Sequence, residues 1–240
     1  MATSLDEGQI QVSGSSAAYE AEVSRIVTNA ILSSVTGKAI AAKIKAHGNV
    51  LITDDYPGID RNDINSEFDP SRSSKNLGIV GYHPHNHRLN TMEVRLNGTL
   101  ITNSQLRFIH KHSPGFAPDQ ILCHELVHAA RYLGGDFHQV RIPSMPDYDN
   151  EEEYYAVLVT NIYTSEKGRN FESLRKSHHR RNGPEMTRPE ESPFVFLMED
   201  DNLRLIAKFC KQHPVIAPMI ARAQCTFNPI RDYYVLASKS

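Results

Sequence analysis

The sequence predicts an α+β fold in which a small β-sheet precedes a long buried helix and the C-terminal part is helical. Short apolar segments of strand length lie before residue 103, whereas the run from Ile121 to Leu133 is long and nearly continuously apolar. Helical spacing returns after Asn150 and after Pro193. Because 40% of the 240 residues are hydrophobic, we expect residues 18–240 to form a single domain.

Residues 1–17 are expected to form a flexible N-terminal segment. They contain few large apolar side chains and several serines, namely Ser4, Ser13, Ser15 and Ser16. A basic start followed by an apolar stretch is missing, which argues against an ordinary secretory signal peptide. Composition alone therefore favours a disordered terminus.

Helices and a small sheet are predicted for the next part of the chain. Apolar side chains repeat at helical spacing over residues 18–34, and Thr36 can cap a second helix that stops near Gly48. The predicted strands, loop and hairpin follow in the order 50–52 (strand), 54–76 (polar loop), 77–80 (strand), and 92–96 with 99–102 (hairpin). The hairpin rests on Asn97-Gly98 between alternating segments, which is a strong turn signal.

The apolar run is predicted to be a helix over residues 118–133. Pro118 suits the first helical position, where its missing N–H would have no partner in any case. Asp119 adds a negative charge that the helix dipole favours at this end. Gly134 and Gly135 follow as a C-terminal stop.

This helix carries His124-Glu125-Leu126-Val127-His128, a match to the zinc-protease pattern H-E-x-x-H. Positions i and i+4 share one helix face, so both imidazoles can bind one metal ion. Glu125 is rotated by about 100° on the same helix. Its carboxylate therefore lies beside the ion, where a general base for a zinc-activated water is needed. We predict one Zn²⁺ per chain.

The third ligand is predicted to be Glu153. A metzincin pattern fails because His138 comes four residues too late and Arg131 replaces the expected glycine. A glutamate on a following helix is the other common arrangement, and Asn150 can cap an apolar helix through residue 162. Glu153 lies on the inward face of that helix. The alternatives are a capping-box role for Glu153, and Glu152, Asp147 or Asp149 as the ligand.

Together these stretches resemble the type III secreted zinc peptidases of bacterial pathogens, the non-LEE-encoded effector D family. The resemblance covers residues 118–170, with His-Glu-Leu-Val-His followed by Glu153-Tyr154-Tyr155-Ala156. The second stretch is also similar to the glutamate helix of anthrax lethal factor. The resemblance implies a zincin-like (gluzincin) metallopeptidase, a serine-rich secretion signal at the N-terminus, delivery into the host cytoplasm by a bacterial secretion system, and cleavage of a host signalling protein such as a MAP kinase.

A tyrosine that stabilises the oxyanion is less clearly placed. Lethal factor carries such a tyrosine seven residues before its metal-binding glutamate. At the corresponding position, seven residues before Glu153, this chain has Pro146. We assign Tyr148 to this catalytic role, with Tyr155, His178 and His179 as alternatives. Two other functions remain open at this point, a non-catalytic zinc-stabilised binding module and an interbacterial toxin with the same chemistry.

The composition of the chain restricts the classes of binding partner that we expect. The net charge of −2 argues against a general nucleic-acid or membrane-surface binder, and no apolar run reaches the roughly 18 residues of a membrane span. We therefore expect a protein substrate and favour a monomer. Three scattered cysteines, Cys123, Cys210 and Cys225, suggest free thiols in a reducing compartment.

Two histidine-containing stretches have no assigned role. His83, His85 and His87 alternate and could form a second metal site, but Pro84 and Asn86 favour a solvated loop. Residues 163–193 are polar and basic, which favours a solvated connection over a substrate-facing loop. Beyond them, Pro193 opens a final helical region that Pro214 interrupts, with a short helix over residues 216–223.

Overall fold

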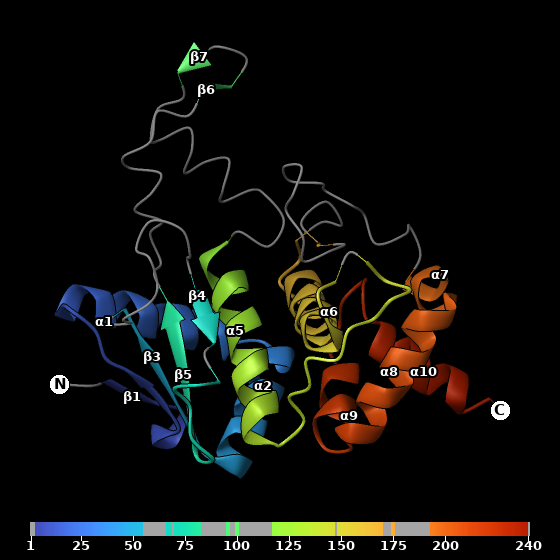
Figure 1. The fold of residues 1–240 in the computed structure, drawn as a ribbon, viewed down its shortest axis with the longest axis horizontal. Coiled ribbons are helices and arrows are strands. Elements are labelled where there is room, and N and C mark those ends of the chain that lie inside the picture. Colours follow the sequence, from blue (N-terminus) through green and yellow to red (C-terminus); the bar gives the residue numbers. More distant parts are fainter. Residues whose placement is uncertain are drawn as a thin grey trace.

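The computed structural model describes residues 3–54, 66–68, 70–82, 95–96, 99–100, 117–146, 148–169, 174–175 and 193–239. These residues form an α+β arrangement, as predicted (Figure 1). The sheet lies at one end, helices α5 and α6 lie in the middle, and the C-terminal helices lie at the opposite end. The two central helices therefore separate the sheet from the C-terminal helices.

The main sheet has five strands in the order β1-β2-β3-β5-β4. Their bounds are Thr3–Leu5 (β1), Ile10–Val12 (β2), Asn49–Thr53 (β3), Ser66–Phe68 (β4) and Leu77–Tyr82 (β5). The three middle strands β2, β3 and β5 run parallel, and the edge strands β1 and β4 run antiparallel to their neighbours. Val12 pairs with Ile52 and Ile52 with Val80, so buried β-branched side chains line up across the sheet.

The N-terminal segment is the first correction to the sequence-based predictions. Instead of a flexible stretch over residues 1–17, the structure has two strands, β1 and β2, joined by the 3-10 turn Asp6–Gly8. Ile10 and Val12 are fully buried beside β3. A strand of three residues is too short to give a clear alternation, which is why composition alone suggested disorder. That residues 18–240 form one domain remains a prediction.

Two predicted helices follow the second strand. The first is α1 (Ala17–Arg25), which continues as the π-helical segment Ile26–Ile31, and the second is α2 (Val35–His47). Ser34, not Thr36, caps α2, since its hydroxyl accepts the N–H of Gly37. The Thr36 hydroxyl instead donates to Oε2 of Glu166 at 2.8 Å, and this bond ties α2 to α6.

The region between the strands of the sheet also differs from the prediction. The loop predicted for residues 54–76 contains β4, which pairs with β5 through Phe68 opposite Val80. Phe68 is the only large apolar side chain of this short edge strand, so the sequence shows no alternation that would predict the strand. The predicted hairpin is confirmed, because β6 (Arg95–Leu96) and β7 (Thr99–Leu100) pair antiparallel.

Helix α5 (Pro118–Leu133) has the predicted bounds and packs on β4 and β5. Gly78 of β5 lets it approach closely, since a Cβ at this position would stand 3.3 Å from the Cβ of Ala129. Gly135 ends the turn after α5 with a φ of +75°, a conformation that glycine adopts readily. The sheet thus fixes the position of α5 through a contact between two small residues.

Helix α6 (Glu151–Glu166) starts as predicted but runs four residues further than the sequence indicated. It packs directly against α5. Four helices follow in the part of the chain that the structure describes, namely α7 (Pro193–Met198), α8 (Asp200–Gln212), α9 (Ile216–Ala221) and α10 (Pro229–Ala237). The interruption at Pro214 is confirmed, whereas α10 was not predicted; Asn228 caps it and Pro229 begins it.

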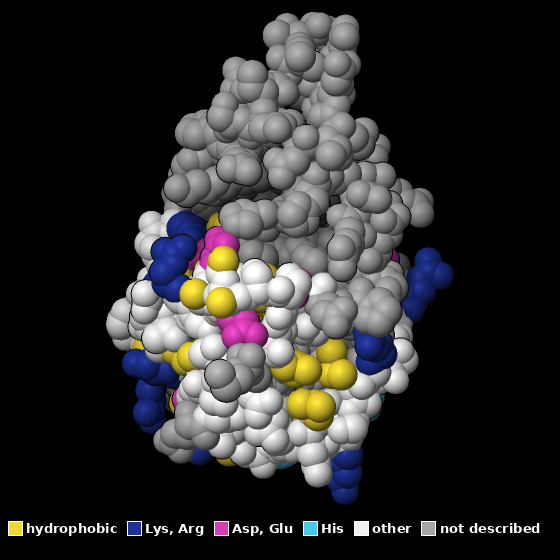
Figure 2. Space-filling view, turned by 90° about the vertical axis from the view of Figure 1, so that its left-hand side faces the viewer, with side chains coloured by type: hydrophobic (Ala, Val, Ile, Leu, Met, Phe, Trp, Pro, Cys, Tyr) yellow, Lys and Arg dark blue, Asp and Glu magenta, His cyan; other side chains and the backbone are white. Residues whose placement is uncertain are grey.

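In the described part of the chain, no helix has both the length and the apolar composition that a bilayer span needs. Figure 2 shows the face on the side of α1 and β1, where small apolar groups are interspersed with acidic and basic side chains.

Candidate metal centre

Helix α5 brings two histidines to one point. His124 and His128 are both buried, and their rings meet nearly edge to face with centroids 4.7 Å apart. The Nε2 atoms of the two rings are 3.1 Å apart. The predicted i, i+4 geometry therefore holds, and both rings direct the same nitrogen to one position.

Helix α6 adds a carboxylate to this position. The side chain of Asn150 accepts the N–H of Glu153 at 3.0 Å, which fixes the first turn of the helix as predicted. The Oε2 atom of Glu153 lies 3.2 Å from Nε2 of His124 and 3.5 Å from Nε2 of His128. This carboxylate is thus directed at the two histidines, which is the arrangement expected of a third ligand.

The three donors fit a tetrahedral metal ion. Ligand atoms held about 2.0–2.1 Å from a tetrahedral zinc ion stand about 3.3–3.4 Å from one another. The three separations here, 3.1, 3.2 and 3.5 Å, surround that value. Two imidazoles and one carboxylate are also a donor set that zinc accepts in catalytic sites. Among the described residues, His124, His128 and Glu153 form the group that could hold a metal ion.

The electrostatics of the cluster favour a cation. Burial lowers the pKa of His124 to about 3. Burial also opposes a charge on His128, but the carboxylates of Glu153 and Glu152 outweigh it and raise the pKa of His128 to about 10. Burial likewise disfavours the charged form of Glu153, yet His128 prevails and holds the pKa of Glu153 well below its usual range. The carboxylates that retain a proton on His128 would equally favour a dication, which displaces that proton when it binds.

Glu125 lies on the sheet side of α5. Its Oε2 atom accepts the backbone N–H of Phe68 at 2.8 Å, so the edge strand β4 positions the predicted base. Glu125 is buried like the two histidines. It follows His124 directly on α5, consistent with the predicted place beside the metal rather than among its ligands. Sequence reasoning missed this strand contact, because β4 lies within the stretch expected to be a loop.

Glu152 occupies the opposite side of His128. One of its oxygens, Oε1, lies 3.1 Å from Nδ1 of His128, and Arg131 donates from Nε to Oε2 at 2.8 Å and to Oε1 at 3.0 Å. Glu152 is therefore not directed at the point that Glu153 shares with the two Nε2 atoms. The sequence contained a signal for this arrangement, since consecutive glutamates in a first turn point in directions about 100° apart.

The two tyrosines considered as oxyanion donors lie in different surroundings. Tyr148 is buried, with its ring 5.2 Å from that of Tyr154. Tyr155 is fully buried, and the guanidinium of Arg131 stacks 4.4 Å from its ring centroid. Tyr155 thus faces the core between α5 and α8, and the role of Tyr148 as an oxyanion donor stays a prediction.

Arg175 is a charged neighbour that sequence reasoning missed. Its backbone N–H donates to Oδ1 of Asn161 at 2.8 Å, and its carbonyl accepts from Nδ2 at 2.6 Å. Burial lowers the pKa of Arg175, whereas Glu153, Tyr148 and Glu125 act in the opposite direction. A cation therefore acts electrostatically on the cluster from the chain that follows α6.

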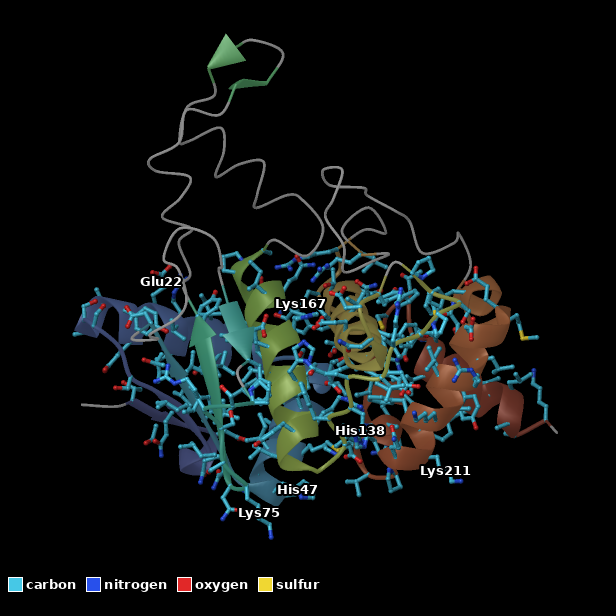
Figure 3. All side chains as sticks on the ribbon, viewed as in Figure 1. Glu22, His47, Lys75, His138, Lys167 and Lys211 are labelled. Atoms are coloured by element: carbon cyan, nitrogen blue, oxygen red, sulfur yellow. The ribbon has the colours of Figure 1, made fainter. Side chains whose placement is uncertain are left out.

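Other predicted candidates lie elsewhere. His138 is exposed beyond the C-terminal end of α5, so it takes no part in the cluster (Figure 3). The three cysteines are free, as expected, and Cys123 is buried in the core. Asp149, another alternative ligand, is exposed at the surface. The remaining candidates fall outside the described residues, namely His83, His85, His87, Asp147, His178 and His179.

Comparison with known proteins gives a family. The Peptidase_M91 family, described as effector proteins, matches residues 6–182, which is well over half of the chain. No curated protein and no solved structure matches the chain. The match includes both helices of the metal cluster and confirms the resemblance to secreted effector peptidases. The chain therefore belongs to the Peptidase_M91 family of effector proteins.

Proposed function

We propose that this protein is a zinc-dependent endopeptidase of the gluzincin type. The observation that carries the proposal is the convergence of Nε2 of His124, Nε2 of His128 and Oε2 of Glu153 at separations suited to one tetrahedral ion. A purely structural zinc site would have no use for Glu125 beside these ligands. Membership of a peptidase family supports the same conclusion.

Each residue has a distinct role in the proposed reaction. His124, His128 and Glu153 would hold the zinc ion. When bound, zinc polarises a peptide carbonyl and lowers the pKa of a water molecule towards about 7. Glu125 takes a proton from the attacking water and later delivers it to the leaving amine. The N–H of Phe68 keeps the carboxylate of Glu125 oriented between these two steps.

The sheet suggests how a substrate would lie. Strand β4 is the last strand of the sheet on the side of α5, and no other described strand pairs with its outer edge. An extended peptide can add to such an edge through main-chain hydrogen bonds. Because the N–H of Phe68 in β4 also donates to Glu125, a peptide bound beside β4 would run close to this base. We therefore expect recognition of an unfolded or extended segment.

The biological setting rests on the family. An effector peptidase acts on protein, and we propose delivery through a bacterial secretion system into the host cytoplasm. The target would be a host signalling protein such as a MAP kinase, as the resemblance implies. We expect the protein to act as a monomer, since His124, His128, Glu125 and Glu153 all come from one chain.

The test compares the wild-type protein with the His124→Ala/His128→Ala double variant. We expect about one zinc per wild-type chain, and new N-termini in host-cell lysate that disappear with a chelator and return with zinc. The double variant should lack both. Stoichiometric zinc in the double variant would refute the site. Bound zinc without any cleavage would favour a non-catalytic binding module, and cleavage confined to bacterial lysate would favour an interbacterial toxin.

A further inference from the structure

A buried chain of polar contacts leads from the metal cluster to the C-terminal helices. It starts at His128, passes through Glu152 and Arg131, and ends at His213, Lys43 and Asp136. Glu152 is 1% exposed, and Arg131 and His213 are each 2% exposed. Burying charged groups raises the free energy of the folded protein unless the groups are paired and hydrogen-bonded. This buried network is therefore a candidate for a functional role.

Arg131 fixes the direction of its own hydrogen bond to His213. Arg131 can only donate, so the Nε2 atom of His213 that it contacts must be unprotonated. The Nδ1 atom of His213 lies 2.9 Å from Nζ of Lys43 and 3.4 Å from Oδ2 of Asp136. Lys43 donates to the same Oδ2 at 2.5 Å. Because the acceptor of Arg131 on α5 comes from the end of α8, the C-terminal helices orient the guanidinium.

The same argument applies to the metal ligand. Glu152 is held by Nε of Arg131 as a charged acceptor. When His128 gives up one proton to bind a metal ion, the proton that it keeps is therefore on Nδ1, which lies 3.1 Å from Oε1. This leaves a lone pair on Nε2, the atom that faces His124 and Glu153. Carboxylates that fix a metal-binding histidine in this way increase its affinity for the ion.

We propose that Glu152 is a positioning residue for the metal site, which fixes His128 with Nε2 directed at the ion. Glu152 is itself held by Arg131, which His213 at the end of α8 contacts in turn. This inference rests on the proposed zinc site and deepens it. It makes residues beyond the family match, which ends at residue 182, part of the support of the metal centre. Two adjacent glutamates of one helical turn would then have different roles. Glu153 would bind the ion, and Glu152 would orient one of its ligands.

The adjacent residue Glu151 supplies a matched control. It is also buried and lies in the same first turn of α6, but its Oε2 accepts from Lys208 at 2.5 Å. Glu151→Gln therefore removes one buried carboxylate from the same turn without touching His128. Any loss common to Glu151→Gln and Glu152→Gln would reflect the stability of α6 rather than the orientation of the ligand.

The experiment measures zinc affinity by competition with a chromophoric chelator, and the visible spectrum of the cobalt-substituted protein. Glu152→Gln should weaken zinc binding by about 10- to 100-fold and change the cobalt spectrum. Arg131→Met and His213→Gln should produce smaller losses in the same direction, because each acts through Glu152. Glu151→Gln should stay within about twofold of the wild type, well below the expected loss.

Two further proteins keep the result interpretable. If Glu152→Gln does not fold, the double variant Arg131→Met/Glu152→Gln removes both buried charges and takes its place. His124→Ala, measured alongside, reports on the zinc site itself. If the wild type fails to bind zinc, or His124→Ala binds it equally well, the proposed function fails. If those two behave as expected but the folded Glu152 variant matches the wild type in affinity and spectrum, the positioning inference alone is wrong.

Discussion

The two sides of α5 hold their functional groups in different ways. On the sheet side, Glu125 accepts a backbone N–H from Phe68 of an edge strand. On the side of α6, Glu152 accepts from both His128 and Arg131 within a fully buried ionic network. An edge strand can shift when a partner pairs with it, whereas a buried network is rigid. A base must exchange protons and meet substrate, whereas metal ligands must keep a fixed geometry.

The largest effects are expected when one glutamate is substituted on each side of α5. Glu125→Gln should lower kcat/KM by about 10²–10⁴-fold while zinc stays bound, because only the proton acceptor is lost. Glu153→Ala should instead weaken zinc binding by more than the ~100-fold typical of a supporting residue. Metal content and kcat/KM on one peptide substrate measure both effects. Normal zinc binding in Glu153→Ala, together with loss of zinc in Glu152→Ala, would reverse the assignment of the two glutamates.

A second test concerns the donor opposite the metal. If Tyr148 stabilises the oxyanion, Tyr148→Phe should lower kcat by about 10²–10³-fold with little change in zinc content or KM. Tyr155→Phe is the matched control, since this ring lies in the core beneath Arg131. Full activity in Tyr148→Phe would exclude Tyr148 and direct attention to Arg175, whose charge acts on the same cluster, and to His178 and His179.

A third test concerns how the sheet fixes the distance to α5. Gly78→Ala places a Cβ 3.3 Å from that of Ala129, and Gly78→Val adds two more carbon atoms. Overpacking of this kind costs about 1–3 kcal/mol in the free energy of unfolding, and we expect the valine variant to lose more. Urea denaturation in the presence of a chelator measures the loss. Equal stability of all three proteins would show that α5 is not pressed against β5.

The sequence was sufficient for the metal-binding helix but not for its supports. The H-E-x-x-H pattern, Pro118 and the double glycine are local signals, so both the helix and its bounds could be predicted. The N-terminal and edge strands are three residues long, too short for periodicity to appear. Their stability comes from pairing with neighbouring strands, β1 with β2, β2 with β3 and β4 with β5, which no local pattern reveals.

The same limit applies to the site. Glu153 could be proposed from helix capping and spacing, since Asn150 and the apolar face of α6 lie close to it in sequence. The role of Glu152 depends on Arg131 and His213, which lie 21 and 61 residues away in the chain. Such a network becomes visible only when α5, α6 and α8 are packed together. Arg175 was missed for the same reason, because its place depends on Asn161.

The last prediction tests the far end of the network through pH. Burial, with the neighbouring charges of Arg131 and Lys43, lowers the pKa of His213 to about 2. In the unfolded chain the pKa of a histidine is about 6.5. Below that value the unfolded state binds a proton that the folded state excludes, so the stability that neutral His213 contributes is lost as pH falls. The slope for one proton reaches about 1.4 kcal/mol per pH unit.

His213→Gln should remove this slope, since glutamine does not titrate in the range. The charged groups that contact His213, which are Lys43, Arg131 and Asp136, remain in the variant, and His124 and His128 titrate in both proteins. The difference in unfolding free energy between wild type and variant, measured metal-free between pH 7 and pH 5, should therefore shrink as pH falls. A difference that stays constant over this interval would mean that His213 takes up a proton in the folded protein. The ring could then no longer accept a hydrogen bond from Arg131, and the network on the α6 side of α5 would lose its contact with the C-terminal helices.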